Sequence, residues 1–154
     1  MNTITYLKPN LHDIPSMQKL VAPEGLSGII LARSDDEIAT NIRSYTLAMD
    51  GDKLVGFCAL HIHSPNLAEI RSMIIDADYR GMDIGSSLVA KVSTEGKELG
   101  LKEILALTYK QQFFERLGFI EIPKESIPEH KIWADCIKCK LFPICNEVSL
   151  IKTL

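Results

Sequence analysis

The stretch LAEIRSMIIDADYRGMDIGSSLVAKV, residues 67–92, decides the fold: an apolar strand, a turn containing Arg80, Gly81 and Gly85, and an amphipathic helix. The first turn of a helix leaves backbone N–H groups without partners, and with the helix dipole these form an anion site. Glycines let a phosphate come close to the backbone, and an arginine adds a charge-assisted contact. This stretch therefore predicts a phosphate-bearing ligand.

Length and composition predict one globular domain over residues 1–154, with 46% hydrophobic and 24% charged residues. The net charge of -3 favours neither nucleic acid nor a membrane surface as a partner. The N-terminus has no basic segment followed by an apolar run, and no stretch reaches about eighteen apolar residues, so we expect a cytoplasmic protein. In that compartment the four cysteines should be reduced: Cys58, Cys136, Cys139 and Cys145.

The first half of the chain predicts two helices and a hairpin. A strand over 3–7 is followed by a helix over 10–21, a loop over 22–28 and a short apolar run over 29–32. Ser34-Asp35-Asp36-Glu37 fits a capping box and should begin a helix that runs to about Arg43. Strands over 45–49 and 53–62, joined by Asp50-Gly51, should form an antiparallel hairpin.

The second half predicts a strand over 67–76, a helix over 83–99 and a strand over 103–108, a crossover whose length makes the two strands parallel and right-handed. A short helix over 111–117 and a strand from 119–120 follow. Prolines make 122–145 irregular, with one helical turn near 129–135, and residues 147–154 can add a final strand. The fold class is mixed α/β.

The order of these elements, with YRGMDIGSSLV (79–89) and FFERLGF (113–119), resembles the GNAT superfamily of acyl-CoA-dependent N-acetyltransferases. The resemblance implies a mixed sheet of six to seven strands flanked by about four helices, with acetyl-CoA as co-substrate and no metal. Asp83 stands where the phosphate-turn pattern usually has its first glycine, and we expect it to cap the helix. The residues implied for acetyl-CoA are Met73, Ile74, Ile75, Arg80, Gly81, Met82, Asp83, Ile84, Gly85, Ser86, Phe113 and Phe114.

A narrower resemblance, carried by GIILARSDDEI (28–38), GFCAL (56–60), Glu69-Ile70 and Leu107-Thr108, is to the acetyltransferase domain of N-acetylglutamate synthase. This amino-acid N-acetyltransferase opens arginine biosynthesis, so the resemblance implies transfer to the α-amino group of L-glutamate. Many members carry an amino-acid-kinase-like domain with the arginine feedback site. We expect no such domain here, so that feedback inhibition would need another site or subunit.

Acetyl transfer needs a held thioester, a deprotonated amine and stabilisation of the negative charge on the carbonyl oxygen. The resemblance makes Glu69 the candidate general base, against the alternative of a structural strand-end glutamate. Strand alternation predicts one shared face for Glu69, Arg71, Met73 and Ile75. On it, Arg71 either pairs with Glu69 and weakens it as a base or forms a surface pair.

Many GNAT enzymes protonate the leaving thiolate with a tyrosine at the position of Phe114, which has no proton to give. The resemblance shifts this role to Thr108, with Tyr109 and solvent as competitors.

Arginine suits bidentate capture of a carboxylate, and Arg33 matches a substrate-binding arginine of this family. Its alternative is a solvated charge beside a helix. His61 and Arg71 complete the predicted substrate-binding residues, although His61 and His63 can equally be exposed strand-end histidines.

Cys136, Cys139 and Cys145 show half of a zinc signature, and we favour reduced cysteines packing the tail over a metal site. Three rivals to the glutamate hypothesis remain: a GNAT enzyme for another small amine or a protein N-terminus, a non-catalytic acyl-CoA-binding regulator, and a metal-binding interaction module. The expected partners are the amino-acid substrate and acetyl-CoA, and the sequence leaves a homodimer open.

Overall fold

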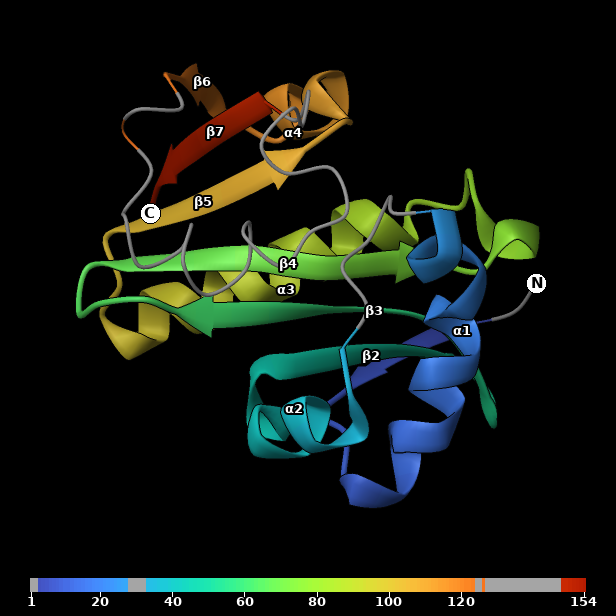
Figure 1. The fold of residues 1–154 in the computed structure, drawn as a ribbon. Helices are drawn as coiled ribbons and strands as arrows, with labels where there is room; N and C mark the ends of the chain where they lie inside the picture. The colour runs from blue at the N-terminus through green and yellow to red at the C-terminus, as the bar shows by residue number, and fades with distance from the viewer. Residues whose placement is uncertain (1–2, 28–32, 124–125, 127–147) are drawn as a thin grey trace.

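A seven-stranded sheet with strand order β1-β2-β3-β4-β5-β7-β6 organises the structure, a computed structural model that describes residues 3–27, 33–123, 126 and 148–154 (Figure 1). Only β4 and β5 are parallel, and every other neighbouring pair is antiparallel. The prediction of a mixed α/β sheet is thereby confirmed. The strands are β1 (Ile4–Leu7), β2 (Tyr45–Asp50), β3 (Lys53–Ile62), β4 (Leu67–Ile75), β5 (Glu103–Thr108), β6 (Ile120–Ile122) and β7 (Val148–Thr153).

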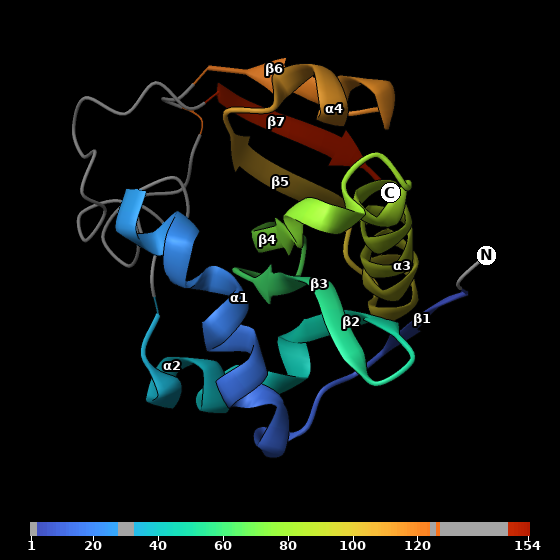
Figure 2. The ribbon, with the colours of Figure 1, turned by 90° about the vertical axis from the view of Figure 1, so that its right-hand side faces the viewer.

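In the part of the chain that the structure describes, α-helices cover the two faces of the sheet, with α1 and α2 on one face and α3 on the other (Figure 2). They are α1 (Ile14–Ser27), α2 (Asp35–Thr40), α3 (Ile84–Leu99) and α4 (Gln111–Arg116), with 3-10 turns η1 (Leu11–Asp13), η2 (Ile42–Ser44) and η3 (Ala77–Tyr79). Among the described residues, no helix is both long and apolar enough to span a bilayer.

Each face has its own apolar core. On the α3 face, the helix buries Ile84, Leu88, Val89 and Val92, as their helical spacing predicts. On the other face, Ile14, Met17 and Val21 of α1 pack with residues of β2 and β3.

Three sequence-predicted boundaries near the N-terminus are wrong. The predicted helix over 10–21 begins as η1, capped by Asn10, and α1 continues to Ser27, through the predicted loop over 22–28. Pro23 removes one i to i-4 hydrogen bond, yet the helix persists because Met17 and Val21 anchor it to the core. The helix predicted from Ser34 to Arg43 ends at Thr40 and is followed by η2, although Ser34 does cap it by accepting from the Glu37 N–H at 3.1 Å.

A β-bulge interrupts β4. Phe57 pairs with Ile74 and Ala59 with Arg71, so Cys58 alone lies opposite both Ser72 and Met73. Ser72 takes the left-handed conformation, with φ 57°.

The bulge overturns the prediction that Glu69, Arg71, Met73 and Ile75 share one face. Arg71 lies beside Ala59 on the α1 face, whereas Met73 and Ile75 pack into the core on the α3 face. The extra residue shifts the period-two alternation by one position, so every side chain after Ser72 changes face.

The parallel pair β4 and β5 separates after Ile70, just before the bulge. The two strands pair only from Leu67–Glu103 to Ile70–Ala106, although β4 continues to Ile75 and β5 to Thr108. Figure 1 shows β5 rising away from β4 toward their C-terminal ends. Among the described residues, the edge of β4 that faces β5 consequently has no pairing strand along its last five residues.

The predicted final strand is confirmed as β7, which lies between β5 and β6. The apolar run over 29–32, the helical turn predicted near 129–135 and the three tail cysteines lie outside the described residues.

Gly56 lies directly opposite Ile75, and a Cβ atom there would stand 3.0 Å from the carbonyl oxygen of Ile74. We expect Gly56→Ala to lower the free energy of unfolding by roughly 1–3 kcal/mol, because backbone of the bulged strand must move. Gly96→Ala is the control, since its Cβ would meet methyl ends of Leu154 and Leu101 at 3.2 and 3.4 Å and alanine favours a helix. Urea unfolding should therefore place the midpoint of Gly96→Ala above that of Gly56→Ala, and equal midpoints would contradict the steric argument.

Candidate active site

The turn over residues 80–86 joins η3 to α3. Gly81 and Asp83 both have positive φ, 81° and 62°. Asp83 occupies the N-cap position but its side chain makes no cap hydrogen bond, which corrects the expectation that it caps the helix. A capping side chain needs an extended backbone, and the left-handed conformation of Asp83 does not provide it.

The β2–β3 hairpin contacts the segment directly before this turn through Asp50 and Lys53. Tyr79 donates a hydrogen bond from its hydroxyl to the Asp50 carboxylate, and Lys53 Nζ lies 3.9 Å from Asp76 and 5.1 Å from the centre of the Tyr79 ring. The hydrogen bond to Asp50 raises the pKa of Tyr79, so the hydroxyl remains a donor at neutral pH. These contacts tie η3, directly before Arg80, to the end of the hairpin.

Gly85 in the first turn of α3 faces Phe113 of α4. A Cβ at Gly85 would stand 3.2 Å from the Phe113 ring, so glycine permits this close approach. Phe113 meets Phe114 edge to face at 5.0 Å, and Phe114 meets Phe119 at 5.1 Å. Phe114 is buried in the core, whereas Phe113 is half-buried next to the turn. The exposed side chains around the turn are Arg80, Met82 and Asp83.

Two candidate acids follow the end of β5. Thr108 is half-buried, and its Oγ1 accepts a hydrogen bond from the Lys110 N–H at 2.9 Å. Tyr109 is 43% exposed. Both lie at the end of β5 that diverges from β4.

Glu69 is buried in β4 together with a histidine. Glu69 Oε1 lies 2.9 Å from His63 Nε2, and both side chains are 2% exposed. His61 is the direct cross-strand neighbour of Glu69, and its ring meets that of His63 edge to face at 4.9 Å. The sequence analysis did not identify His63 as a partner of Glu69, although the short connection between β3 and β4 places it diagonally across from that residue.

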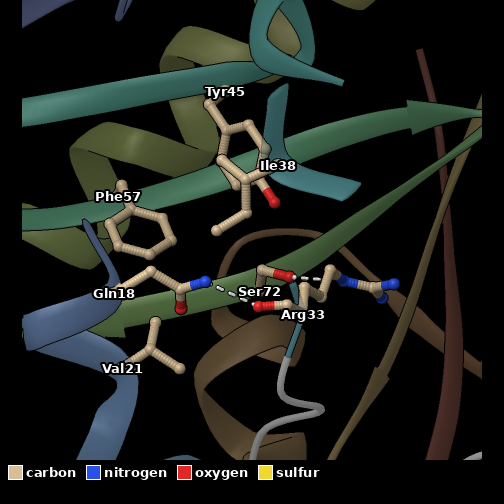
Figure 3. Close-up of a pocket in the computed structure, with 7 residues that line it drawn as sticks. All are labelled: Gln18, Val21, Arg33, Ile38, Tyr45, Phe57 and Ser72. Atoms are coloured by element: carbon tan, nitrogen blue, oxygen red, sulfur yellow. Dashed lines mark hydrogen bonds between the residues drawn. The ribbon is translucent and has the colours of Figure 1, made fainter. Parts of the chain in front are cut away.

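A pocket on the α1 face is lined by Gln18, Val21, Arg33, Ile38, Tyr45, Phe57 and Ser72 (Figure 3). The Arg33 side chain is 9% exposed, which excludes the alternative of a solvated charge beside a helix. Its Nε donates to Ser72 Oγ at 3.3 Å, its Nη1 lies 3.5 Å from Glu37, and its carbonyl oxygen accepts from Gln18 at 2.7 Å.

Tyr45 links this pocket to Arg71. Burial raises the pKa of Tyr45, while the positive charges of Arg33 and Arg71 and a hydrogen bond with Ser72 oppose the shift. Both guanidinium groups therefore act on one buried hydroxyl, on the face of β4 that carries Glu69. Sequence analysis selected Arg33 and Arg71 but not Tyr45, Gln18 or Ser72, because only the folded chain brings these three to the arginine.

Cys58, the one cysteine among the described residues, is fully buried, which raises the pKa of its thiol to about 12. It stays protonated at neutral pH and does not serve as a nucleophile. In the part of the chain that the structure describes, no group of three or more His, Cys, Asp or Glu residues is arranged to hold a metal ion.

A parallel strand pair that opens beside a helix start, with a glycine turn and an arginine before that helix, forms an anion site next to an open strand edge, as a phosphate-bearing ligand requires. The sequence profile of the acetyltransferase (GNAT) family matches residues 12–119. The chain belongs to this family, and it is an acyl-CoA-dependent N-acetyltransferase with acetyl-CoA as co-substrate.

Known proteins similar to the chain are of two kinds. An uncharacterized N-acetyltransferase of Chlorobaculum tepidum is 35% identical over 94% of this chain and 92% of its own length. An amino-acid acetyltransferase of Mannheimia succiniciproducens is 28% identical over 79% of this chain, which spans only 28% of that relative.

Solved structures show the same fold. N-acetylglutamate synthase of Neisseria gonorrhoeae, complexed with coenzyme A and N-acetyl-glutamate, superposes on all of this chain with a TM-score of 0.88 at 20% identity, and the match covers 36% of that chain. A Mycobacterium tuberculosis protein in complex with CoA matches over 97% of this chain and 99% of its own, with a TM-score of 0.82 at 22% identity.

The buried contact between His63 and Glu69 can be tested by unfolding. We expect His63→Leu to lower the free energy of unfolding by roughly 1–3 kcal/mol, because the Glu69 carboxylate loses a hydrogen-bond donor where water does not replace it. Adding Glu69→Gln to His63→Leu should restore part of this stability, since a neutral amide is cheaper to bury. An unfolding midpoint in urea equal to that of the wild type would show that the contact contributes nothing.

Proposed function

We propose that the chain transfers the acetyl group of acetyl-CoA to the α-amino group of L-glutamate, the reaction that forms N-acetylglutamate for arginine biosynthesis. The observation that carries this proposal is the placement of Arg33 and Arg71 on the face of β4 that also bears the buried Glu69. Glutamate has two carboxylates and one amine. In this arrangement the two arginines bind the carboxylates, and the Glu69 carboxylate lies beside the amine.

Recognition of the acceptor then rests on charge. Arg33 is held in a largely buried position, where a charge-assisted hydrogen bond to a carboxylate is stronger than in water. Arg71 binds the second carboxylate in this arrangement, and His61, beside Glu69, borders the acceptor. An amine without carboxylates would gain no charge-assisted contact with either guanidinium group, which disfavours its binding.

The described residues fit acetyl-CoA. The first-turn N–H groups of α3, with Gly81, Gly85, Ser86 and Arg80, would hold the pyrophosphate, and the open backbone of Met73, Ile74 and Ile75 would hold the pantetheine. Met82, Ile84, Phe113 and Phe114 would line the same site, and the exposed Asp83 carboxylate stays in solvent. When bound, acetyl-CoA supplies an acetyl group activated as a thioester.

Glu69 acts as the general base in this proposal. Its burial leaves too little exposed surface for direct proton exchange with bulk solvent, so the amine proton reaches it through an ordered water or on closure around the acceptor. Nε2–H of His63 donates to the carboxylate and fixes its orientation.

The leaving thiolate takes its proton from Thr108 or Tyr109. Phe114 is a core residue with no acidic proton to donate. Thr108, the last residue of β5, and Tyr109 carry their hydroxyl groups at the end of β5 that diverges from β4. We propose direct transfer: among the described residues the one cysteine, Cys58, stays a protonated thiol inside the core.

The relatives support the acceptor class only in part. They include amino-acid acetyltransferases, but this chain spans 28% of the length of the Mannheimia succiniciproducens protein. The Chlorobaculum tepidum protein, matched nearly end to end, has no stated acceptor.

The proposal predicts glutamate-dependent release of CoA, measured with a thiol reagent across a panel of L-glutamate, L-glutamine, L-aspartate, a polyamine and a peptide. Arg33→Ala should raise the KM for L-glutamate about tenfold or more, because a charge-assisted contact is lost, while leaving the KM for acetyl-CoA unchanged. Arg43→Ala is the matched control, since Arg43 is exposed in η2.

If the enzyme acetylates only the polyamine or the peptide, the acceptor is that amine and not glutamate. Tight binding of acetyl-CoA without CoA release from any amine would identify a regulator rather than an enzyme. An equal rise of both KM values in Arg33→Ala would remove Arg33 from the acceptor site.

The acid is tested by Thr108→Val and Tyr109→Phe. We expect the variant that removes the proton donor to lower kcat by roughly a hundredfold, the usual scale of general acid catalysis, with both KM values nearly unchanged. Full turnover in both variants would assign protonation of the thiolate to solvent.

A further inference from the structure

Ser72 stands at an unusual point of the sheet. It is one of two non-glycine residues with positive φ among the described residues, and it lies in the bulge where β4 carries one residue more than β3. A left-handed conformation is disfavoured for serine, whereas glycine would adopt it without strain. A residue kept in this conformation needs a reason in its side chain.

The Ser72 hydroxyl provides that reason by contacting two side chains from other elements. Its Oγ accepts from Arg33 Nε at 3.3 Å (Figure 3), and it lies close enough to the buried Tyr45 to lower the pKa of that hydroxyl. Arg33 lies 39 residues earlier in the chain, just before α2, and Tyr45 opens β2. The bulge thus turns a strand residue toward the pocket, where it joins three segments.

We propose that Ser72 is the positioning residue of Arg33: its hydroxyl fixes the direction of the guanidinium toward the acceptor carboxylate and so contributes to acceptor selectivity. This inference rests on the proposed function.

The hydrogen bond to Ser72 comes from the Nε–H of the Arg33 guanidinium and not from its Nη groups. Arginine grips a carboxylate with the two parallel N–H bonds of a fork, and a hydrogen bond from Nε to Ser72 leaves the Nη groups outside this contact. In Figure 3 the guanidinium extends beyond Ser72, away from the apolar residues of the pocket. Without the hydroxyl, the contact of Nη1 with the exposed Glu37 would remain, but the acceptor would have to restrict more of the rotation about the arginine side-chain torsions, at a cost in affinity.

The same residue connects the two halves of the site. Ser72 immediately precedes Met73, the first residue of the strand edge assigned to the pantetheine, and the bulge it forms is the point where β4 has left β5. In this proposal the orientation of the Arg33 side chain is therefore fixed by β4, the strand that carries the thioester, as well as by the α1–α2 segment.

Ser72→Ala and Ser72→Gly separate the hydroxyl from the backbone. Alanine removes the hydroxyl and keeps the strain, whereas glycine removes both. We expect both variants to raise the KM for L-glutamate about tenfold, with kcat and the KM for acetyl-CoA within about twofold of the wild type. Ser72→Gly should at the same time unfold at a urea concentration no lower than Ser72→Ala, since it relieves the left-handed conformation.

A double-variant cycle with Arg33→Ala tests whether Ser72 acts through the arginine. In the Arg33→Ala background, Ser72→Ala should cause no further rise in the KM for L-glutamate, because the group that it positions is gone. If Ser72 has only a structural role, Ser72→Ala lowers the free energy of unfolding in both backgrounds, and its effect on the KM for L-glutamate does not depend on Arg33.

The outcomes distinguish this proposal from the proposed function. Glutamate turnover with independent effects of the two substitutions overturns the role of Ser72 and leaves the function intact. Turnover of a different carboxylate-bearing amine, with the coupling preserved, supports Ser72 and overturns glutamate as acceptor. Ser72→Gly with wild-type KM values, or a wild type inactive toward every amine, overturns the role of Ser72.

Discussion

The separation of β4 from β5 after four paired residues is the constraint on which the rest of the site depends. Backbone N–H and C=O groups along a strand require partners, and in a continuous sheet β5 would supply them to the whole of β4. The pairing ends at Ile70, just before the bulge at Ser72 and Met73, so the edge of β4 over residues 71–75 has no pairing strand among the described residues. In the proposed function this open edge is the surface along which the pantetheine lies.

Polar groups gather where this strand leaves its neighbour, and they are buried. Glu69 with His63, and Arg33 with Ser72, each combine an ionisable side chain with a defined hydrogen-bond partner in a site of low exposure. Burying an ionisable side chain costs free energy unless its hydrogen-bond partner is buried with it. In the proposed function these groups on the α1 face contribute to the chemistry, because a preorganised charge in a dry site acts strongly on a substrate.

Local patterns predicted much of this structure. Strand periodicity located β2, β3 and β5 to within one residue, and the glycines after α3 and α4 marked their ends. Predictions failed where a local rule competed with a distant contact. Pro23 did not end α1, which the core holds in place, and Asp83 did not cap α3, because the preceding turn imposes a left-handed backbone. The faces of Met73 and Ile75 could not be predicted, since a bulge leaves no period-two signature.

Sequence alone determined the kind of protein: a strand, a glycine-containing turn and a helix over residues 67–92 specify an anion site through local geometry, and Glu69 and Arg33 were selected by residue type and position. Only the tertiary structure decided how these residues are partnered. His63, Ser72 and Tyr45 reach them through strand register and the bulge, and burial sets the strength of each contact. Backbone preferences depend on residues that are neighbours in the chain, so the sequence alone predicts them. Desolvation and hydrogen bonds between distant segments arise only after the sheet has formed.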